Sequence, residues 1–196
     1  MNINRREALA RLMAITGTAM VGAEFFLSGC ARPAPNRTQA FTPDELALLD
    51  EIADTIIPTT STPGAKAAKV GAFMAMTAHD CYDDASYASF RGGIAKVDAA
   101  SRKQHGKPFM QATAAERTAV LTALDGEQKQ FEGSKQRGEA THYFRLMKDL
   151  TILGYFSSEI GCTQALRYVE SPGAYHGDVA YHHGDRSWYN PTRRIT

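Results

Sequence analysis

An apolar stretch between residues 143 and 156 constrains the fold more than any other part of the chain, because it repeats with a helical period. Five of its residues recur at steps of three and four and share one helix face: Tyr143, Leu146, Met147, Leu150 and Leu153. Ile152, Tyr155 and Phe156 extend this surface around the cylinder, which predicts a helix buried on most sides. Gly154 inside the stretch predicts either the close approach of another backbone or a kink.

Other helices are expected ahead of this stretch. A capping box of Thr42 and Glu45 opens the first one, and Pro58 ends it. Further helices are expected over about residues 66–82, from Asp83-Asp84 to the basic loop 102–107, and from the capping box of Thr113 and Glu116 through Leu124. Residues 126–138 are polar and predict a connection.

The fold class follows from these patterns. No sustained two-residue alternation of the kind that strands require is present, and no internal repeat. Pro172-Gly173 breaks regular structure, and the residues beyond it have no period. We predict an all-α fold, an irregular helical bundle of about five helices with a long irregular C-terminal arm from about residue 169.

The N-terminal residues 1–29 have the composition of an export signal. The pair Arg5-Arg6 resembles a twin-arginine signal, and a mildly apolar stretch follows it. This stretch ends in a sequence that resembles a bacterial lipobox, so cleavage before Cys30 would leave a lipidated N-terminal cysteine. An ordinary signal with a chance cysteine and a cytosolic amphipathic helix are the alternatives. Residues 30–41 read as a flexible tether and residues 42–196 as a single helical domain.

Composition and motifs exclude several classes of function. The formal net charge is +1 and no dense Lys/Arg patch is present, which argues against a nucleic-acid partner. Neither the G-x-S-x-G nor the G-x-G-x-x-G pattern occurs, so no hydrolase nucleophile or dinucleotide site is indicated. CxxC and CxxCH are also absent, which argues against a redox dithiol or a covalently attached haem. We therefore predict no catalytic residues in this chain.

Two cysteines remain beyond Cys30. In an exported protein, Cys81 and Cys162 could form a disulfide, or they could be two separate buried thiols. Their spacing alone does not decide between the two, because a disulfide requires a specific separation of the Cβ atoms.

A group of histidines and aspartates lies in the arm: His176, His182, His183, Asp178 and Asp185. Such a group could bind a metal. However, His182 and His183 are adjacent and point apart in an extended chain, so solvated or interface histidines are the favoured interpretation. We predict no metal site.

Aromatic residues give the arm its character. They are Tyr168, Tyr175, Tyr181, Trp188 and Tyr189, with His176 among them. Tyrosine and tryptophan combine a large contact area with a polar tip and are enriched at interfaces, which predicts a partner surface. The alternative is an arm that packs over its own bundle.

Two segments of the chain resemble the gluconate 2-dehydrogenase subunit 3 family. Glu45–Val70, ELALLDEIADTIIPTTSTPGAKAAKV, is similar to the opening helix and turn of that family. Leu153–Val179, with its LGYFSSEIG and SPGAYHGDV sequences, is similar to the closing helix and Pro-Gly turn. The twin-arginine leader is a third point of similarity.

This resemblance implies a non-catalytic accessory subunit. Its partner would be a large FAD-dependent dehydrogenase of the GMC type that acts on sugars or polyols, often with a cytochrome c subunit that takes the electrons. FAD would belong to the partner, and any haem or iron–sulfur group to other subunits. The large subunit would cross the inner membrane through the twin-arginine translocase while bound to this chain. The complex would then lie in the bacterial periplasm, anchored to a membrane through Cys30. The alternative is a stand-alone metal-binding or structural lipoprotein.

Overall fold

The computed structural model describes residues 40–136, 138–170, 173–174 and 177–189. These residues form five α-helices and two short helical segments: α3 (Pro43–Ile56), α4 (Val70–Cys81), α5 (Asp84–His105), the 3-10 helix η1 (Phe109–Gln111), α6 (Ala114–Ser134), α7 (Tyr143–Ser157) and the π-helix η2 (Gly161–Ala165). No strand occurs among the described residues. The predicted all-α fold is therefore confirmed.

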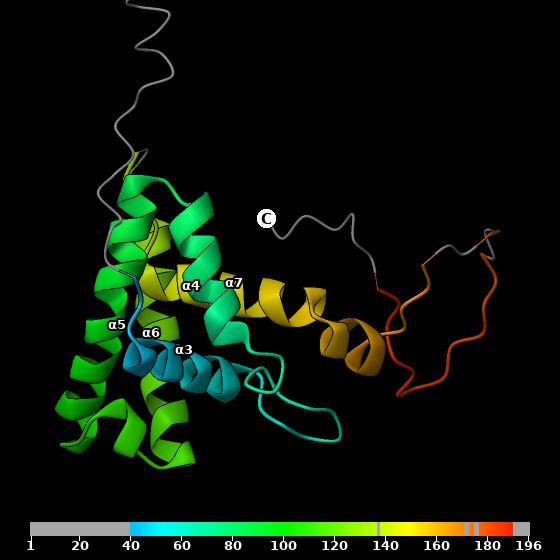
Figure 1. Ribbon diagram of the computed structural model, residues 1–196, viewed down its shortest axis with the longest axis horizontal. Helices are drawn as coiled ribbons and strands as arrows, with labels where there is room; N and C mark the ends of the chain where they lie inside the picture. Colours follow the sequence, from blue (N-terminus) through cyan, green and yellow to red (C-terminus); the bar gives the residue numbers. More distant parts are fainter. Residues whose placement is uncertain (1–39, 137, 171–172, 175–176, 190–196) are drawn as a thin grey trace, which may run out of the picture. The chain divides into compact units, whose positions relative to one another are not determined.

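The helix α7 lies at the centre of the bundle and contacts α3, α4, α5 and α6 (Figure 1). Eight of its fifteen residues are buried, including Phe144, Met147 and Tyr155. The other helices bury their apolar faces against it, with Leu49 and Ile52 from α3 completely covered. Burial on most sides of α7 agrees with its apolar periodicity, but Leu153 and Phe156, which the sequence placed on the buried surface, are exposed in the last turns of the helix.

Two capping boxes begin helices where the sequence places them. The Thr42 hydroxyl accepts a hydrogen bond from the Glu45 amide at 3.2 Å, and the Glu45 carboxylate accepts one from the Thr42 amide at 2.8 Å. Thr113 and Glu116 make the same pair of contacts at the start of α6. Each box satisfies backbone donors that a helix N-terminus otherwise leaves unpaired.

Three predicted helix boundaries were wrong. The second helix starts at Val70 and not near residue 66, because Lys69 has a left-handed backbone with φ 54°. The third helix continues through most of the predicted basic loop to His105, and Gly106 ends it with φ 72°. The fourth helix extends to Ser134, although the sequence predicted a connection from residue 126.

Glycines bring the side chains of neighbouring helices against α5 and α7. A Cβ atom at Gly93 of α5 would lie 2.6 Å from the Cβ of Tyr143, so this position has no room for a side chain. At Gly154 of α7 the neighbour is the ring of Phe73, whose Cδ1 atom would lie 2.5 Å from such a Cβ. The expected close approach at Gly154 therefore exists, but it is made by an aromatic side chain and not by another backbone.

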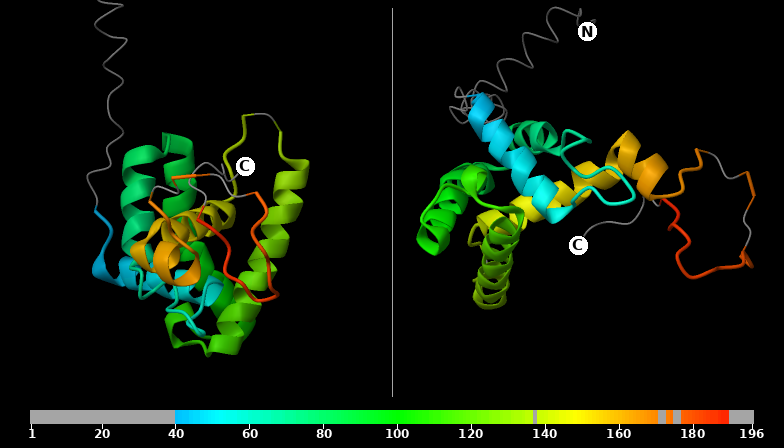
Figure 2. Two further views of the ribbon diagram at one scale, coloured as in Figure 1. Left: turned by 90° about the vertical axis from the view of Figure 1, so that its right-hand side faces the viewer. Right: turned by 90° about the horizontal axis from the view of Figure 1, so that it is seen from below.

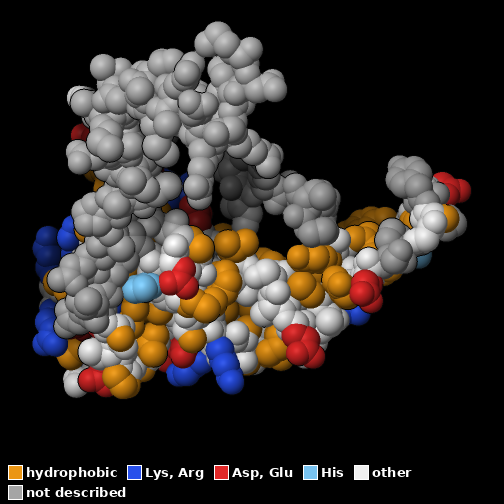
Figure 3. Space-filling view, turned by 45° about the horizontal axis from the view of Figure 1, so that its top comes forward, with side chains coloured by type: hydrophobic (Ala, Val, Ile, Leu, Met, Phe, Trp, Pro, Cys, Tyr) orange, Lys and Arg blue, Asp and Glu red, His pale blue; other side chains and the backbone are white. Residues whose placement is uncertain are grey.

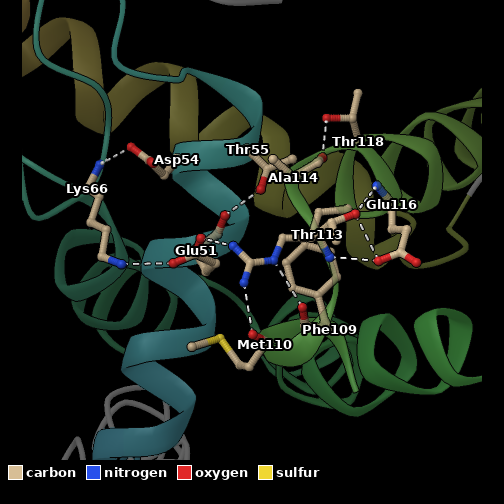
Figure 4. A network of polar contacts seen from close by, with 11 residues as sticks. Glu51, Asp54, Thr55, Lys66, Phe109, Met110, Thr113, Ala114, Glu116 and Thr118 are labelled. Atoms are coloured by element: carbon tan, nitrogen blue, oxygen red, sulfur yellow. Dashed lines mark hydrogen bonds and ion pairs between the residues drawn. The ribbon is translucent and has the colours of Figure 1, made fainter. Parts of the chain in front are cut away.

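A polar network joins α3 to η1 and α6 (Figure 4). The Arg117 guanidinium pairs with Glu51 of α3 and donates to the carbonyl oxygens of Phe109 and Met110, at 3.1 and 2.8 Å. Lys66 approaches the other oxygen of Glu51 at 2.8 Å. Burial raises the pKa of Glu51, but the Lys66 hydrogen bond and the Arg117 charge outweigh it, so this pKa lies below its ordinary value.

Candidate functional site

The junction between α7 and η2 sets the direction in which the arm leaves the bundle. The Ser158 hydroxyl donates to the carbonyl oxygen of Tyr155 at 2.6 Å and accepts from the Gly161 amide at 3.0 Å. Residue 161 must be glycine in this geometry, because a Cβ atom there would lie 1.9 Å from the same carbonyl oxygen. The Tyr155 hydroxyl in turn donates to the carbonyl of Pro63 at 2.7 Å, which ties the turn after α3 to this end of α7.

Two segments of the arm pair with each other beside η2. The Arg167 amide donates to the carbonyl of Ser187 at 2.9 Å, and the Tyr189 amide donates to the carbonyl of Arg167 at 2.8 Å. These bonds form a parallel bridge between Arg167 and Trp188. Figure 1 and Figure 2 show the last described part of the arm, drawn in red, returning to η2. We call residues 166–168 and 186–189 the stem of the arm.

Side chains reinforce this stem. The Arg167 guanidinium lies 3.1 Å from the Asp185 carboxylate and 5.5 Å from the centre of the Trp188 ring. Arg186 donates to the carbonyl oxygens of Thr163 and Gln164, at 3.2 and 2.8 Å, at the C-terminal end of η2. A cation at the end of a helix offsets the negative end of its dipole and satisfies free carbonyl groups.

The described aromatic residues of the arm reach solvent. Tyr168 is 48% exposed, Trp188 54% and Tyr181 73%, while Tyr189 is half-buried against Tyr168 with their ring centres 5.6 Å apart. These exposed side chains do not fit the alternative in which the arm packs wholly over its own bundle. Tyr175 and His176, which the sequence also assigned to this surface, lie outside the described residues.

A hollow of about 550 Å³ lies between the end of α7, η2 and the stem. Its walls come from eight residues: Ser157, Glu159, Cys162, Thr163, Tyr168, Val169, Glu170 and Tyr189. Figure 3 shows one face of the molecule, on which apolar side chains form patches over the helices, with acidic side chains between them and along the arm.

Comparison with known proteins assigns the family. The family model described as Gluconate 2-dehydrogenase subunit 3 matches residues 43–173, which is more than half of the chain. The chain belongs to the gluconate 2-dehydrogenase subunit 3 family. Comparisons with the curated proteins and with the solved structures find no significant match.

Membership in the gluconate 2-dehydrogenase subunit 3 family gives the chain a general role. The chain is an accessory subunit of a dehydrogenase complex and associates with other subunits of that complex. The matched residues include every described helix and the first segment of the stem, whereas Trp188 and Tyr189 lie beyond them.

The two described cysteines of this family member, Cys81 and Cys162, are free thiols. Cys81 is the last residue of α4 and is exposed, whereas Cys162 is buried in η2, where its Sγ atom lies 3.2 Å from the carbonyl oxygen of Phe156. The disulfide that the sequence left open is therefore absent, and the alternative of two buried thiols fails for Cys81. Burial raises the pKa of the Cys162 thiol, which keeps it protonated at neutral pH.

The described histidines of the arm do not gather into a metal site. His182 lies 3.7 Å from the Asp185 carboxylate, and its amide donates to that carboxylate at 3.0 Å. Among the described residues, no three His, Cys, Asp or Glu side chains come together as a metal ion would require. His176 lies outside the described residues.

The predicted targeting residues Arg5, Arg6 and Cys30 also lie outside the described residues. Within the described part of the chain, no helix has both the length and the apolar character needed to cross a bilayer.

Sequence reasoning missed the contacts that hold the arm in place. Asp185 was noted only as a possible metal ligand, and Arg167 and Arg186 belong to no local motif, because their partners are distant in the chain or are backbone carbonyls. The aromatic residues of the arm predicted an exposed surface. No pattern in the sequence predicted that two segments of the arm pair to form the stem.

Proposed function

We propose that this chain is the non-catalytic small subunit of a membrane-associated periplasmic dehydrogenase that oxidises sugars or polyols with FAD. In this proposal the chain is needed for export, folding or stability of the FAD-containing catalytic subunit. A cytochrome c subunit would accept the electrons. The family supports an accessory role, and the remaining steps are our inference.

The observation that carries the proposal is the exposed aromatic surface on the stem and arm. Tyr168, Tyr181 and Trp188 leave large areas in water, although backbone bonds and the Arg167–Asp185 pair hold the stem that carries two of them. A rigid surface that presents aromatic side chains loses little conformational entropy on binding, which favours a docking role. The catalytic subunit is the partner that the family makes most suitable.

Export through the twin-arginine route fits a chain of this kind. That route carries folded proteins, so a catalytic subunit that has already taken up FAD could cross while bound to this chain. Arg5 and Arg6 would serve as the signal for both proteins, and a lipid on Cys30 would hold the exported complex at a membrane.

Co-expression tests the proposal. The catalytic subunit is produced with and without this chain, and its FAD content, activity and cellular fraction are measured. We expect FAD loading, periplasmic location, or both, to be lost without this chain. Unchanged loading, export and activity of the catalytic subunit alone would contradict the proposal.

The export step has its own test. Arg5→Lys with Arg6→Lys should leave both proteins in the cytoplasm, because the twin-arginine translocase reads the arginine pair. Cys30→Ala is the control, since it should release the complex from the membrane without stopping export. Export of the catalytic subunit beside the double lysine variant would exclude transport as a bound pair.

A further inference from the structure

The hollow beside η2 carries two carboxylates and no basic side chain on its walls. Glu159 and Glu170 both line it, and both are exposed. Among the described residues, neither carboxylate forms an ion pair or a side-chain hydrogen bond, and the charged side chains of the stem pair elsewhere. The hollow therefore has a net negative charge that its own walls do not neutralise.

The nearest basic side chains in the stem are already engaged. Arg167 pairs with Asp185 and lies over the Trp188 ring, and Arg186 donates to the carbonyl oxygens of two η2 residues. These contacts hold the stem, so moving either guanidinium to Glu159 or Glu170 would break them. While the stem keeps these contacts, its two arginines leave the negative charge of the hollow without a partner.

Aromatic rings form another wall of the same hollow. The rings of Tyr168 and Tyr189 lie 5.6 Å apart at an angle of 51°. The face of a tyrosine ring attracts a cation through its quadrupole, and carboxylates beside it add charge attraction. Aromatic rings together with carboxylates are a chemical environment suited to a guanidinium or ammonium group.

A second groove on the molecule provides an internal comparison. It has a volume of about 200 Å³ and lies between α3, α6 and α7. The carboxylate on its wall, Asp125, is neutralised by Lys129 and Lys148, each at 2.6 Å. The hollow beside η2 differs from this groove because no lysine or arginine of the described residues fills that role for Glu159 or Glu170.

We propose that the hollow beside η2 binds an arginine or lysine side chain of the partner subunit, between the carboxylates of Glu159 and Glu170 and the rings of Tyr168 and Tyr189. This inference rests on the proposed function, since it names what the partner presents to the arm. It places the centre of the interface at the stem, on the side that carries Tyr168 and Tyr189.

Neutralising the carboxylates tests this inference. The exported chain with Glu159→Gln and Glu170→Gln is titrated with the flavin-containing subunit that purifies with the wild-type chain, and the Kd is measured. We expect binding to weaken about tenfold or more, because the cationic side chain of the partner loses both carboxylates that would pair with it. The wild-type affinity should also fall more steeply with ionic strength than that of the variant.

A matched control carries the same change in net charge elsewhere. Asp44→Asn with Glu139→Gln removes two exposed carboxylates, one from the first turn of α3 and one from the connection between α6 and α7. Neither residue lines the hollow. This control should bind as the wild type does, and the thermal midpoint of each variant shows that it is folded.

The outcomes separate the two proposals. If the wild-type chain binds no flavin-containing subunit, the proposed function fails and this inference fails with it. If the wild type binds and the Glu159, Glu170 variant has the same Kd and salt dependence, only the inference about the hollow is overturned. Equal weakening by the control pair would also overturn it, since the effect would then come from total charge.

Discussion

Gly161 lies so close to Tyr155 that a Cβ atom at position 161 would stand 1.9 Å from the Tyr155 carbonyl oxygen. This contact lets the π-helix η2 turn back against the last turn of α7. The stem and the exposed aromatic side chains follow η2 in the chain, and η2 itself forms part of the hollow, so the position of all three depends on this one glycine.

Gly161→Ala should therefore destabilise the protein and displace η2. We expect a loss of about 2 kcal/mol or more in the free energy of unfolding, because the neighbour is backbone and cannot move aside as a side chain can. Urea unfolding measures this loss.

Gly126→Ala in α6 is the control, because a Cβ atom there would meet nothing within 4 Å. Alanine at position 126 should be neutral or stabilise the protein by about 0.5–1 kcal/mol. Equal effects of the two substitutions would contradict this account.

Helix starts could be predicted from the sequence where a local signal fixes them. Thr42 and Thr113 act through residues three positions away, so their capping boxes are visible in the sequence. The start of α4 was missed because Lys69 has a positive φ, which its residue type does not announce. The length of α6 was missed because Gly126 and Gly133 lower helix propensity, while the helix tolerates both.

The site could be predicted only in outline. The aromatic residues of the arm stand out by composition, and three of the described ones are indeed exposed. The pairing of Arg167 with Asp185 and with the Trp188 backbone joins positions about twenty residues apart, and no periodicity links them. The hollow depends on that pairing, so it could not be derived before the stem was known.

Arg117→Met should destabilise the bundle. The change leaves the half-buried Glu51 with only Lys66 and removes the donors to the carbonyl oxygens of Phe109 and Met110. We expect a loss of about 2 kcal/mol in the free energy of unfolding, measured by urea titration.

The control for this substitution is Lys129→Met. Lys129 pairs with Asp125 at 2.6 Å, but its side chain is 67% exposed, and Asp125 keeps Lys148 as a partner. Its replacement should cost less than about 0.5 kcal/mol. A loss for Arg117→Met as small as this would show that the network in Figure 4 contributes little to stability.

Asp125 should make stability depend on pH in acid. Hydrogen bonds from Lys129 and Lys148 lower its pKa from 3.8 to about 2 in the folded chain. Because the folded pKa is the lower one, the ionised carboxylate stabilises the fold above about pH 4, and this contribution disappears as the pH falls through 2. After solvent screening we expect about 1 kcal/mol.

The Asp125→Asn variant isolates this contribution. Glu116 has a pKa of about 2 as well, held down by Lys107 and Thr113, so the wild type loses stability in the same range for two reasons. The difference in unfolding free energy between wild type and Asp125→Asn should shrink between pH 4 and pH 2. A difference that stays constant over this range would show that Asp125 does not titrate with a lowered pKa.

Arg167→Ala should loosen the stem without unfolding the bundle. The change removes the ion pair with Asp185 and the guanidinium from the Trp188 ring, while the core helices keep all their contacts. These two surface interactions together contribute about 1 kcal/mol, so exchange of the Tyr189 amide hydrogen should become about fivefold faster. Trp188 is the only tryptophan, so stronger acrylamide quenching of its fluorescence would report the same opening.

The control is Arg102→Ala, which removes a comparable pair with Asp98 in α5 and should change neither signal. Unchanged exchange and quenching in Arg167→Ala would mean that the backbone bonds to Ser187 and from Tyr189 hold the stem without help from this side chain.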